Sequence, residues 1–331
     1  MGKFTSVNFP ICFFRKITRI FAIYFSQKQI FFNKYTYRYI TMSKPTPIDA
    51  KVLEEFIDDA LYEDVREGDH TSLATIPSDA RSRAKLLVKD AGVIAGIELA
   101  KAVFHRVDET AKVEVFIEEG ASVSYGDIVF EVECNSQALL KAERLVLNAM
   151  QRMSGIATMA NRFKFEVEDL PVKILDTRKT TPLLRFLEKW AVKLGGCENY
   201  RHGLYDWIMI KDNHIDACGG IQEAILSAAK YQKENNLELG VTVEVRNLVE
   251  LYKVLEVGEG KVTRIMLDNF DLPLLKEAVA IIGDQFETEA SGGVNINTVR
   301  KIAKTGVQYI SVGALTHSFI SLDMSLKVIK E

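Results

Sequence analysis

Short apolar runs recur along the second half of the chain, and each ends in a polar residue or a glycine. After Leu170 the runs end at Asp176, Lys211, Glu244, Asp268, Ser291 and Gly313, at intervals of 35, 33, 24, 23 and 22 residues. Most of the intervening segments place apolar residues at i, i+3 and i+4, which is the helical period. A strand, a crossover helix and two loops need about this length of chain. The pattern therefore predicts repeated β/α units around a parallel sheet.

We expect this parallel sheet to form an α/β barrel of the TIM-like type. A dinucleotide-binding fold is not supported, because no G-x-G-x-x-G motif follows a strand. In an α/β barrel the active site lies at the carboxyl ends of the strands. The polar residues and glycines that end the apolar runs occupy that position, so they form the candidate site.

The first half of the chain has a mixed pattern. PIDAKVLEEFIDDALYEDV has the period of an amphipathic helix, whereas RAKLLVKDAGVIAG and AKVEVFIEEGASVSYGDIVFEVEC resemble strands around glycine-containing turns. A long helix is predicted over SQALLKAERLVLNAMQRMSGIATMANRFKFEV, with an interruption near Ser154 and Gly155. We therefore expect a small α+β domain over residues 42–150, ahead of the barrel.

Residues 1–41 differ from the rest of the chain in charge and aromatic content. They carry seven Lys or Arg, no Asp or Glu, and 12 of the 31 aromatic residues. A basic segment without acidic residues is compatible with an organelle transit peptide. The alternative that we favour is an extension outside the folded protein, with Met42 as the functional start. On that alternative we expect a cytoplasmic protein.

Composition excludes some classes of protein. The formal net charge of −3 over 331 residues gives no indication of binding to nucleic acid or to a membrane surface. Residues 1–41 contain no uncharged apolar run of 18 residues, so a transmembrane helix is not expected there. The four cysteines are scattered without a C-x-x-C pair, which argues against a disulfide framework or a structural zinc site.

Cations form the first group of candidate residues. Arg178 and Lys179 follow the strand that ends at Asp176, Lys211 follows the next strand, and Arg201 comes from the loop GGCENYRHGL. Several cations at one mouth repel one another unless anions balance them, so a polyanionic ligand is expected. Any one of them could instead be a surface residue or pair internally, as Arg178 or Lys179 could with Asp176.

Carboxylates and glycines form the other two groups. Glu244 and Asp268 end neighbouring strands, where they can bind sugar hydroxyls, hold Mg²⁺, stabilise developing positive charge, or only neutralise the cations. The segment Ser291–Gly293 and Gly313 follow the last two strands, where glycine lets backbone N–H groups approach a phosphate. The residues alone therefore predict a barrel enzyme that acts on a phosphorylated sugar and a carboxylated partner, with Mg²⁺.

Eight segments together resemble the quinolinate phosphoribosyltransferase family, also called nicotinate-nucleotide pyrophosphorylase (carboxylating). In chain order they are EDVREGDHTS, AERLVLNAMQRMSGIAT, DTRKTTPLLR, IKDNHI, VEVRN, MLDN, EASGGVN and SVGALTHS. The match runs from about Ile48 to Lys330. The resemblance implies transfer of the phosphoribosyl group of phosphoribosyl pyrophosphate to quinolinate with decarboxylation. The products would be nicotinate mononucleotide, pyrophosphate and CO₂, in NAD biosynthesis.

The resemblance also implies an architecture and an assembly. An N-terminal α+β sandwich domain would pack against an incomplete α/β barrel over residues 151–312, and a tail over residues 313–331 would return to the N-terminal domain. The subunits would form a homodimer or a higher oligomer, in which Arg144 reaches into the neighbouring site. The cofactor would be Mg²⁺, held by Glu244 and Asp268 directly or through pyrophosphate or water.

The family motifs imply a role for each candidate residue. Arg178 and Arg201 would grip the carboxylates of quinolinate, and Lys179 and Lys211 would serve carboxylates or phosphates. The residues expected at the catalytic step are Lys179, Lys211, Glu244 and Asp268. The residues expected to bind substrate are Arg144, Arg178, Lys179, Tyr200, Arg201, Lys211, Glu244, Asp268, Ser291, Gly292, Gly293 and Gly313.

One position departs from the family pattern. The family usually has a histidine directly before the arginine of the GG…NHR loop, whereas this chain has Tyr200 there and His202 two residues later. Tyrosine can donate a hydrogen bond to a carboxylate but carries no positive charge near neutral pH. Losing one charge-assisted contact costs about 1 to 3 kcal/mol of binding. We expect an active enzyme with weaker quinolinate binding.

Two alternatives remain open at this point. The first is a relative that uses another aromatic acid such as nicotinate, which would need fewer cations than Arg144, Arg178 and Arg201 provide together. The second is a non-catalytic paralogue that binds a phosphorylated ligand, which Tyr200 favours and the intact carboxylates disfavour.

Overall fold

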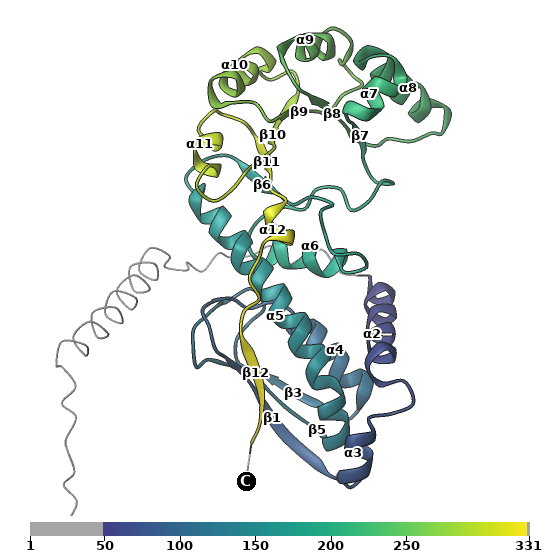
Figure 1. Cartoon of the computed structure of the whole chain (residues 1–331), viewed down its shortest axis with the longest axis vertical. Helices are drawn as coiled ribbons and strands as arrows, with labels where there is room; N and C mark the ends of the chain where they lie inside the picture. Colours follow the sequence, from purple (N-terminus) through teal and green to yellow (C-terminus); the bar gives the residue numbers. More distant parts are fainter. Residues whose placement is uncertain (1–48, 330–331) are drawn as a thin grey trace, which may run out of the picture. The chain divides into compact units, whose positions relative to one another are not determined.

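The computed structural model describes residues 49–329, in which an antiparallel sheet with its helices is followed by a series of β/α units (Figure 1). The leader and the proposed start at Met42 lie outside these residues. The elements associated with the antiparallel sheet are α2 (Ala50–Val65), α3 (His70–Thr75), β1 (Arg81–Val88), β2 (Gly92–Val93), α4 (Ile97–Val107), β3 (Lys112–Val115), β4 (Ser122–Val123), β5 (Ile128–Asn135), α5 (Ser136–Glu166) and β12 (Met324–Val328).

The antiparallel sheet has four strands in the order β12-β1-β5-β3. Alternate residues of β1 are buried, namely Ala84, Leu86 and Val88, and α4 and α5 pack together beside the sheet. Phe104 of α4 meets Phe130 of β5 edge to face, with ring centroids 6.1 Å apart. Strand β12, close to the end of the chain, pairs antiparallel with β1 and thereby forms one edge of this sheet.

Helix α5 runs from Ser136 to Glu166 without a break, so the predicted interruption near Ser154 and Gly155 is wrong. The Ser154 hydroxyl accepts a hydrogen bond from the Ala95 N–H at 2.9 Å. A Cβ on Gly155 would lie 2.3 Å from the carbonyl oxygen of Ile320. The two small residues therefore serve the close approach of other segments to the helix, and the helical hydrogen bonds continue past them.

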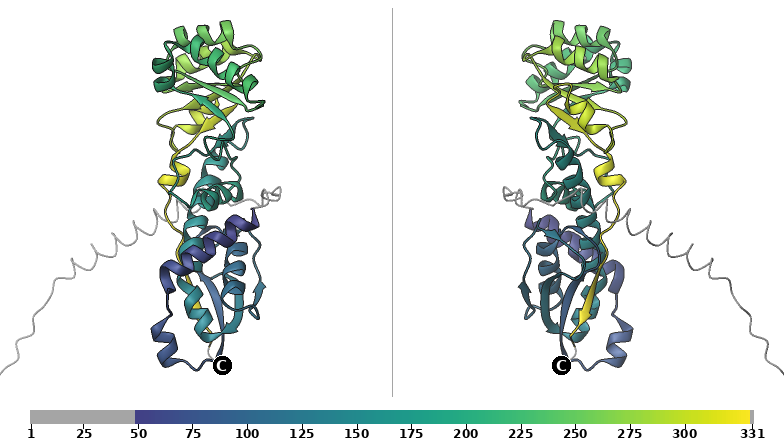
Figure 2. Two further views of the ribbon diagram at one scale, coloured as in Figure 1. Left: turned by 90° about the vertical axis from the view of Figure 1, so that its right-hand side faces the viewer. Right: turned by 90° about the vertical axis from the view of Figure 1, so that its left-hand side faces the viewer.

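The β/α units form a six-stranded parallel sheet in the order β6-β11-β10-β9-β8-β7. The helices that follow the central strands lie on the outer side of this sheet (Figures 1 and 2). The bounds are β6 (Lys173–Leu175), α6 (Arg185–Leu194), β7 (Ile208–Ile210), α7 (Asp212–Cys218), α8 (Ile221–Glu234), β8 (Val241–Val245), α9 (Leu248–Val257), β9 (Arg264–Asp268), α10 (Leu272–Ile282), β10 (Glu287–Ser291), α11 (Val299–Ala303), β11 (Tyr309–Ser311) and α12 (Ala314–His317).

Strands β6 and β7 are consecutive in the chain, but they lie at opposite edges of the sheet. The segment between them pairs with β6 through one parallel bridge, from Leu175 to Glu198. The sheet is therefore an incomplete barrel that opens between β6 and β7. The predicted α/β fold with a TIM-like incomplete barrel and a separate α+β part is confirmed.

The barrel interior contains a buried ion pair. Arg264, 7% exposed at its side chain, lies 3.2 Å from the fully buried carboxylate of Glu289 and 2.7 Å from Glu287. Its guanidinium also stacks 3.7 Å from the ring centroid of Tyr309. Planar stacking and several donors on one ion suit arginine for this place, because each charge stays paired after water is excluded.

Replacing Arg264 by Met is expected to lower the free energy of unfolding by about 3 to 5 kcal/mol, because Glu289 would be left buried without its counter-ion. Urea denaturation followed by circular dichroism would measure the change. Lys230→Met is the matched control, since Lys230 pairs with Glu234 on the exposed surface of α8. An equal loss in both variants would contradict the prediction.

Candidate active site

Four of the candidate residues lie at the carboxyl ends of neighbouring parallel strands. Lys211 follows β7, Glu244 is in β8, Asp268 ends β9 and Ser291 ends β10, opposite Asp268 in the register. The Lys211 ammonium lies 2.8 Å from a Glu244 carboxylate oxygen. Parallel strands place these ends at one edge of the sheet, so a cation, two carboxylates and a hydroxyl face one region.

A turn with left-handed backbone conformations follows Ser291. Gly292 and Gly293 have φ of +95° and +59°, and Asn269 beside them has φ of +55°. The Asn269 N–H donates to the Ser291 carbonyl at 2.9 Å, and its side-chain amide donates to Asp268 at 2.6 Å. The glycine turn and the Asp268–Asn269 turn therefore support each other's backbone conformation.

The DTRKTT loop of the first unit meets the last unit of the barrel. A Cβ on Gly313 would lie 3.0 Å from Cδ of Lys179 and 3.0 Å from Nε2 of His317. The Thr316 hydroxyl donates to the Lys179 carbonyl at 2.8 Å. Lys179 and Gly313 are thus brought together, as β6 and β11 are neighbours in the sheet. His317 joins them and was not among the predicted residues, although it stands in the motif SVGALTHS.

Arg178 and Arg201 are brought close enough for their charges to interact. Burial, followed by the positive charge of Arg178, lowers the pKa of Arg201 from its ordinary value. Nε of Arg178 is buried without a hydrogen-bond partner among residues 49–329. Arg201 donates to the Trp207 carbonyl at 3.3 Å. Two guanidinium groups in one partly buried region leave a strong preference for an anion.

Tyr200 does not direct its hydroxyl to the carboxyl ends of the strands. The hydroxyl lies 2.5 Å from Oγ1 of Thr242, which precedes Glu244 by two residues on β8. The ring packs edge to face on Trp207, and Arg264 lies over it. Burial raises the pKa of the Tyr200 phenol. Tyr200 therefore fills the barrel interior one layer below Glu244, whereas the sequence led us to expect a contact with substrate.

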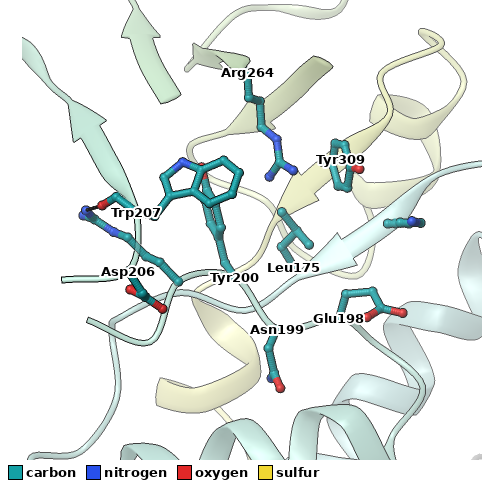
Figure 3. Close-up of a pocket in the computed structure, with 10 residues that line it drawn as sticks. Leu175, Glu198, Asn199, Tyr200, Asp206, Trp207, Arg264 and Tyr309 are labelled. Carbon is teal, nitrogen blue, oxygen red and sulfur yellow. Dashed lines mark hydrogen bonds between the residues drawn. The ribbon is translucent and has the colours of Figure 1, made fainter. Parts of the chain in front are cut away.

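A cavity of about 300 Å³ lies beside Tyr200 (Figure 3). Figure 3 shows Arg264 between Tyr309 and the pair formed by Trp207 and Tyr200. The lining comes from β6, from the segment that leads into β7, and from the first residues of β9 and β11: Lys173, Leu175, Glu198, Asn199, Tyr200, Arg201, Asp206, Trp207, Arg264 and Tyr309. Among these residues only Tyr200 and Arg201 belong to the predicted site.

Helix α6 supplies buried charges that the sequence did not reveal. Lys189 forms an ion pair with Asp176, and both are fully buried. Glu188, also fully buried, pairs with Arg152 of α5 at 2.5 Å. The internal pair that we considered between Asp176 and the adjacent cations is therefore replaced by one with Lys189. The signal available was FLEKWAVKL, where the adjacent charges of Glu188 and Lys189 interrupt an apolar run.

Arg144 is exposed on α5, on the antiparallel-sheet side of Arg152. The two positions are eight residues apart, which corresponds to about 12 Å along the helix axis. Arg152 touches the DTRKTT loop through Thr181 at 2.5 Å. Arg144 is therefore set back along the helix from that loop.

Two kinds of feature, a side-chain cluster for a metal ion and a membrane-spanning helix, are absent from residues 49–329. Residues 49–329 contain no group of three or more His, Cys, Asp or Glu arranged to hold a metal ion. At the sheet edge the Glu244 carboxylate pairs with Lys211, and the Asp268 carboxylate accepts a hydrogen bond from the Asn269 amide. In the same residues no helix is long and apolar enough to cross a bilayer.

Gly292→Ala is expected to destabilise the fold by about 2 to 4 kcal/mol, since the new Cβ meets Asn269 atoms and the backbone conformation is strained. The Cβ would lie 2.1 Å from Oδ1 and 2.9 Å from the backbone nitrogen of Asn269. Gly293→Ala is the matched control, because nothing lies within 4 Å of its Cβ and only the strained φ remains. Denaturant titration would compare the two, and equal losses would contradict the steric argument.

The sequence is similar to plant enzymes. A Nicotiana glauca protein named quinolinate phosphoribosyltransferase (decarboxylating) 2, mitochondrial, is 47% identical over 298 residues, covering 86% of this chain and 84% of the relative. An Arabidopsis thaliana protein named nicotinate-nucleotide pyrophosphorylase (carboxylating), chloroplastic, is 47% identical over 298 residues, covering 86% and 85%. These names are mitochondrial and chloroplastic, so the expectation of a cytoplasmic location is wrong.

Solved structures and family models agree with these relatives. NadC from Streptococcus pyogenes is 34% identical with a TM-score of 0.79, covering 86% of this chain and 100% of that one. The nicotinate-nucleotide pyrophosphorylase from Francisella tularensis has the same identity and TM-score, covering 86% and 98%. The N-terminal domain of quinolinate phosphoribosyl transferase matches residues 69–154, and its C-terminal domain matches residues 156–327. The chain therefore belongs to the quinolinate phosphoribosyltransferase family.

Proposed function

We propose that this protein transfers the phosphoribosyl group of phosphoribosyl pyrophosphate to quinolinate and releases pyrophosphate and CO₂. The observation that carries the proposal is the neighbouring pair of cations Arg178 and Arg201. One guanidinium has a buried, unpartnered Nε, and the pKa of the other is lowered by burial and by the first. A dicarboxylate supplies one anion to each arginine, whereas a monocarboxylate leaves one charge unbalanced.

The carboxylates at the sheet edge suit the chemical step. The ring nitrogen of quinolinate attacks C1 of the ribose as the bond from C1 to the pyrophosphate oxygen breaks. Positive charge develops at C1, and Glu244 and Asp268 stabilise it electrostatically. Lys211 balances the charge of Glu244 before substrate arrives, at a separation of 2.8 Å. Loss of the carboxylate beside the nitrogen then releases CO₂, and the ring carbon takes up a proton.

The residues fit Mg²⁺ of the kind that arrives with a phosphorylated substrate. Mg²⁺ keeps several waters and is usually bound through one or two carboxylates together with substrate phosphates. Glu244 and Asp268 supply two carboxylates, and Asp268 is oriented by the Asn269 amide. When bound, the ion would neutralise charge on the departing pyrophosphate.

The phosphate end of the sugar is assigned to the last two units of the barrel. Gly292 and Gly293 leave backbone N–H groups accessible, and Ser291 adds a hydroxyl. Lys179 lies against Gly313 and provides the positive charge there. This assignment places the 5′-phosphate beside β10 and β11, and the quinolinate carboxylates beside the opening between β6 and β7.

The position of Arg144 supports a proposal about assembly. Its exposed side chain, set back along α5, suits a contact with a neighbouring subunit better than a contact with its own barrel. We therefore include in the proposal a homodimer in which Arg144 contributes a cation to the partner's quinolinate site.

Incubation of the protein with quinolinate, phosphoribosyl pyrophosphate and Mg²⁺ is expected to give nicotinate mononucleotide, while nicotinate gives none. Arg201→Met is expected to raise the KM for quinolinate by about 10-fold to 100-fold, because one charge-assisted contact is lost. Its stability should not fall, since the repulsion of Arg178 is removed. Turnover of nicotinate would favour the relative that uses another aromatic acid. Substrate binding without turnover would favour the non-catalytic paralogue.

Tyr200→Phe is expected to leave the KM for quinolinate within about threefold and to lower the free energy of unfolding by about 1 kcal/mol. The reason is that the hydroxyl bonds to Thr242 inside the barrel. Steady-state kinetics and urea denaturation would measure the two effects. A tenfold rise in KM at unchanged stability would mean instead that the hydroxyl reaches the substrate.

A further inference from the structure

Two segments carry the arginines, and two groups of polar contacts, a lower tie and an upper tie, connect these segments. The first segment runs from Asp176 to Thr180 and contains Arg178. The second runs from Asn199 to His202 and contains Arg201. The Asp176 carboxylate accepts hydrogen bonds from the Tyr200 N–H at 2.8 Å and from the Asn199 amide at 2.6 Å. One end of the first segment is thereby tied to the second.

Lys189 of helix α6 is the cation of this lower tie. Lys189 is fully buried, forms the ion pair with Asp176, and donates to the Tyr200 carbonyl at 3.3 Å. The Lys189 carbonyl in turn accepts from the Asn199 amide at 2.8 Å. Both oxygens of the Asp176 carboxylate and the Lys189 ammonium therefore have partners, as a buried ion pair requires if it is to hold one geometry.

Arg185, one turn earlier on α6, provides the upper tie. Its Nε donates to the Thr180 hydroxyl at 3.0 Å, and its Nη1 donates to the His202 carbonyl at 2.9 Å. Thr180 and His202 stand just beyond the two arginines in their segments. In each segment the arginine therefore lies between the residue of the lower tie and the residue of the upper tie.

The far side of the DTRKTT loop is also anchored to α6. Glu188 precedes Lys189 in sequence, and its carboxylate accepts from the Thr181 N–H at 3.3 Å and pairs with Arg152. Successive helix residues point about 100° apart, so two adjacent charges can hold two different elements. The loop cannot shift along α6 without breaking a buried ion pair.

We propose that α6 acts as a clamp that fixes the spacing between Arg178 and Arg201, with Asp176, Lys189 and Arg185 as positioning residues for the dicarboxylate. Two guanidinium groups without an anion repel each other and would otherwise separate. The clamp limits how far the two arginine-bearing segments can separate before the substrate arrives. The entropy cost of ordering these side chains is therefore incurred partly during folding, so it weakens substrate binding less. The inference rests on the proposed function.

Asp176→Asn and Arg185→Met test the two ties separately. Each is expected to raise the KM for quinolinate by tenfold or more and to change the KM for phosphoribosyl pyrophosphate by less than threefold. Arg185→Met leaves the buried ion pair intact, so it remains informative if Asp176→Asn does not fold. Phe104→Leu, in the antiparallel-sheet core, is the control for lost stability and should change neither constant.

Parallel rises in both Michaelis constants, or unchanged constants in folded Arg185→Met, would overturn the clamp. Absence of product from the wild-type protein would contradict the proposed function instead. In that case calorimetric titration of the same proteins with quinolinate tests the clamp directly. Binding that weakens in both variants but not in Phe104→Leu would support it, and equal binding in all of them would refute it.

Discussion

One buried carboxylate joins three parts of the barrel. Asp176 directly follows the first parallel strand, pairs with Lys189 of the next helix, and accepts hydrogen bonds from the segment that leads to the second strand. A buried ion pair is costly unless its remaining hydrogen bonds are made. In this barrel the remaining hydrogen bonds of Asp176 come from Asn199 and the Tyr200 N–H. Because the buried carboxylate needs these donors, it fixes the position of the loop that carries them.

The need for these ties follows from the open sheet. Strands β6 and β7 do not pair, so the chain between them lacks the ladder that fixes the other units. Its contacts include the single bridge to Leu175, the Asp176 network, the bond from Arg185 to the His202 carbonyl, and Tyr200 inserted into the barrel. Tyr200 and Trp207, which pack beside Arg264 of β9, fill space that a closed barrel would fill with strand residues. A tyrosine at this position thus has a packing role that its sequence neighbours do not reveal.

Helix α5 contacts both the antiparallel sheet and helix α6 of the barrel. Its first half packs beside the antiparallel sheet, while Arg152 reaches Glu188 and the DTRKTT loop. The segment that returns to β12 crosses the same helix at Gly155 and places Phe319 against the Arg152 guanidinium at 4.8 Å. Helix α5 therefore contacts both the antiparallel sheet and the loop that carries Arg178 and Lys179.

The sequence by itself determined the parallel strands, because strands buried on both faces leave apolar runs at a regular interval, and the strand ends placed Lys211, Glu244 and Asp268 at one edge. It also identified the family through motifs such as DTRKTTP. Only the tertiary structure decided where Tyr200 points, that α5 continues through Gly155, and that Lys189 pairs with Asp176. These features depend on contacts between segments that are distant in the sequence. Gly155 suggests a helix break in the sequence, whereas in the structure it allows the close approach of the Ile320 backbone. Likewise, a lysine in an apolar helix reads as a surface residue until its buried partner is known.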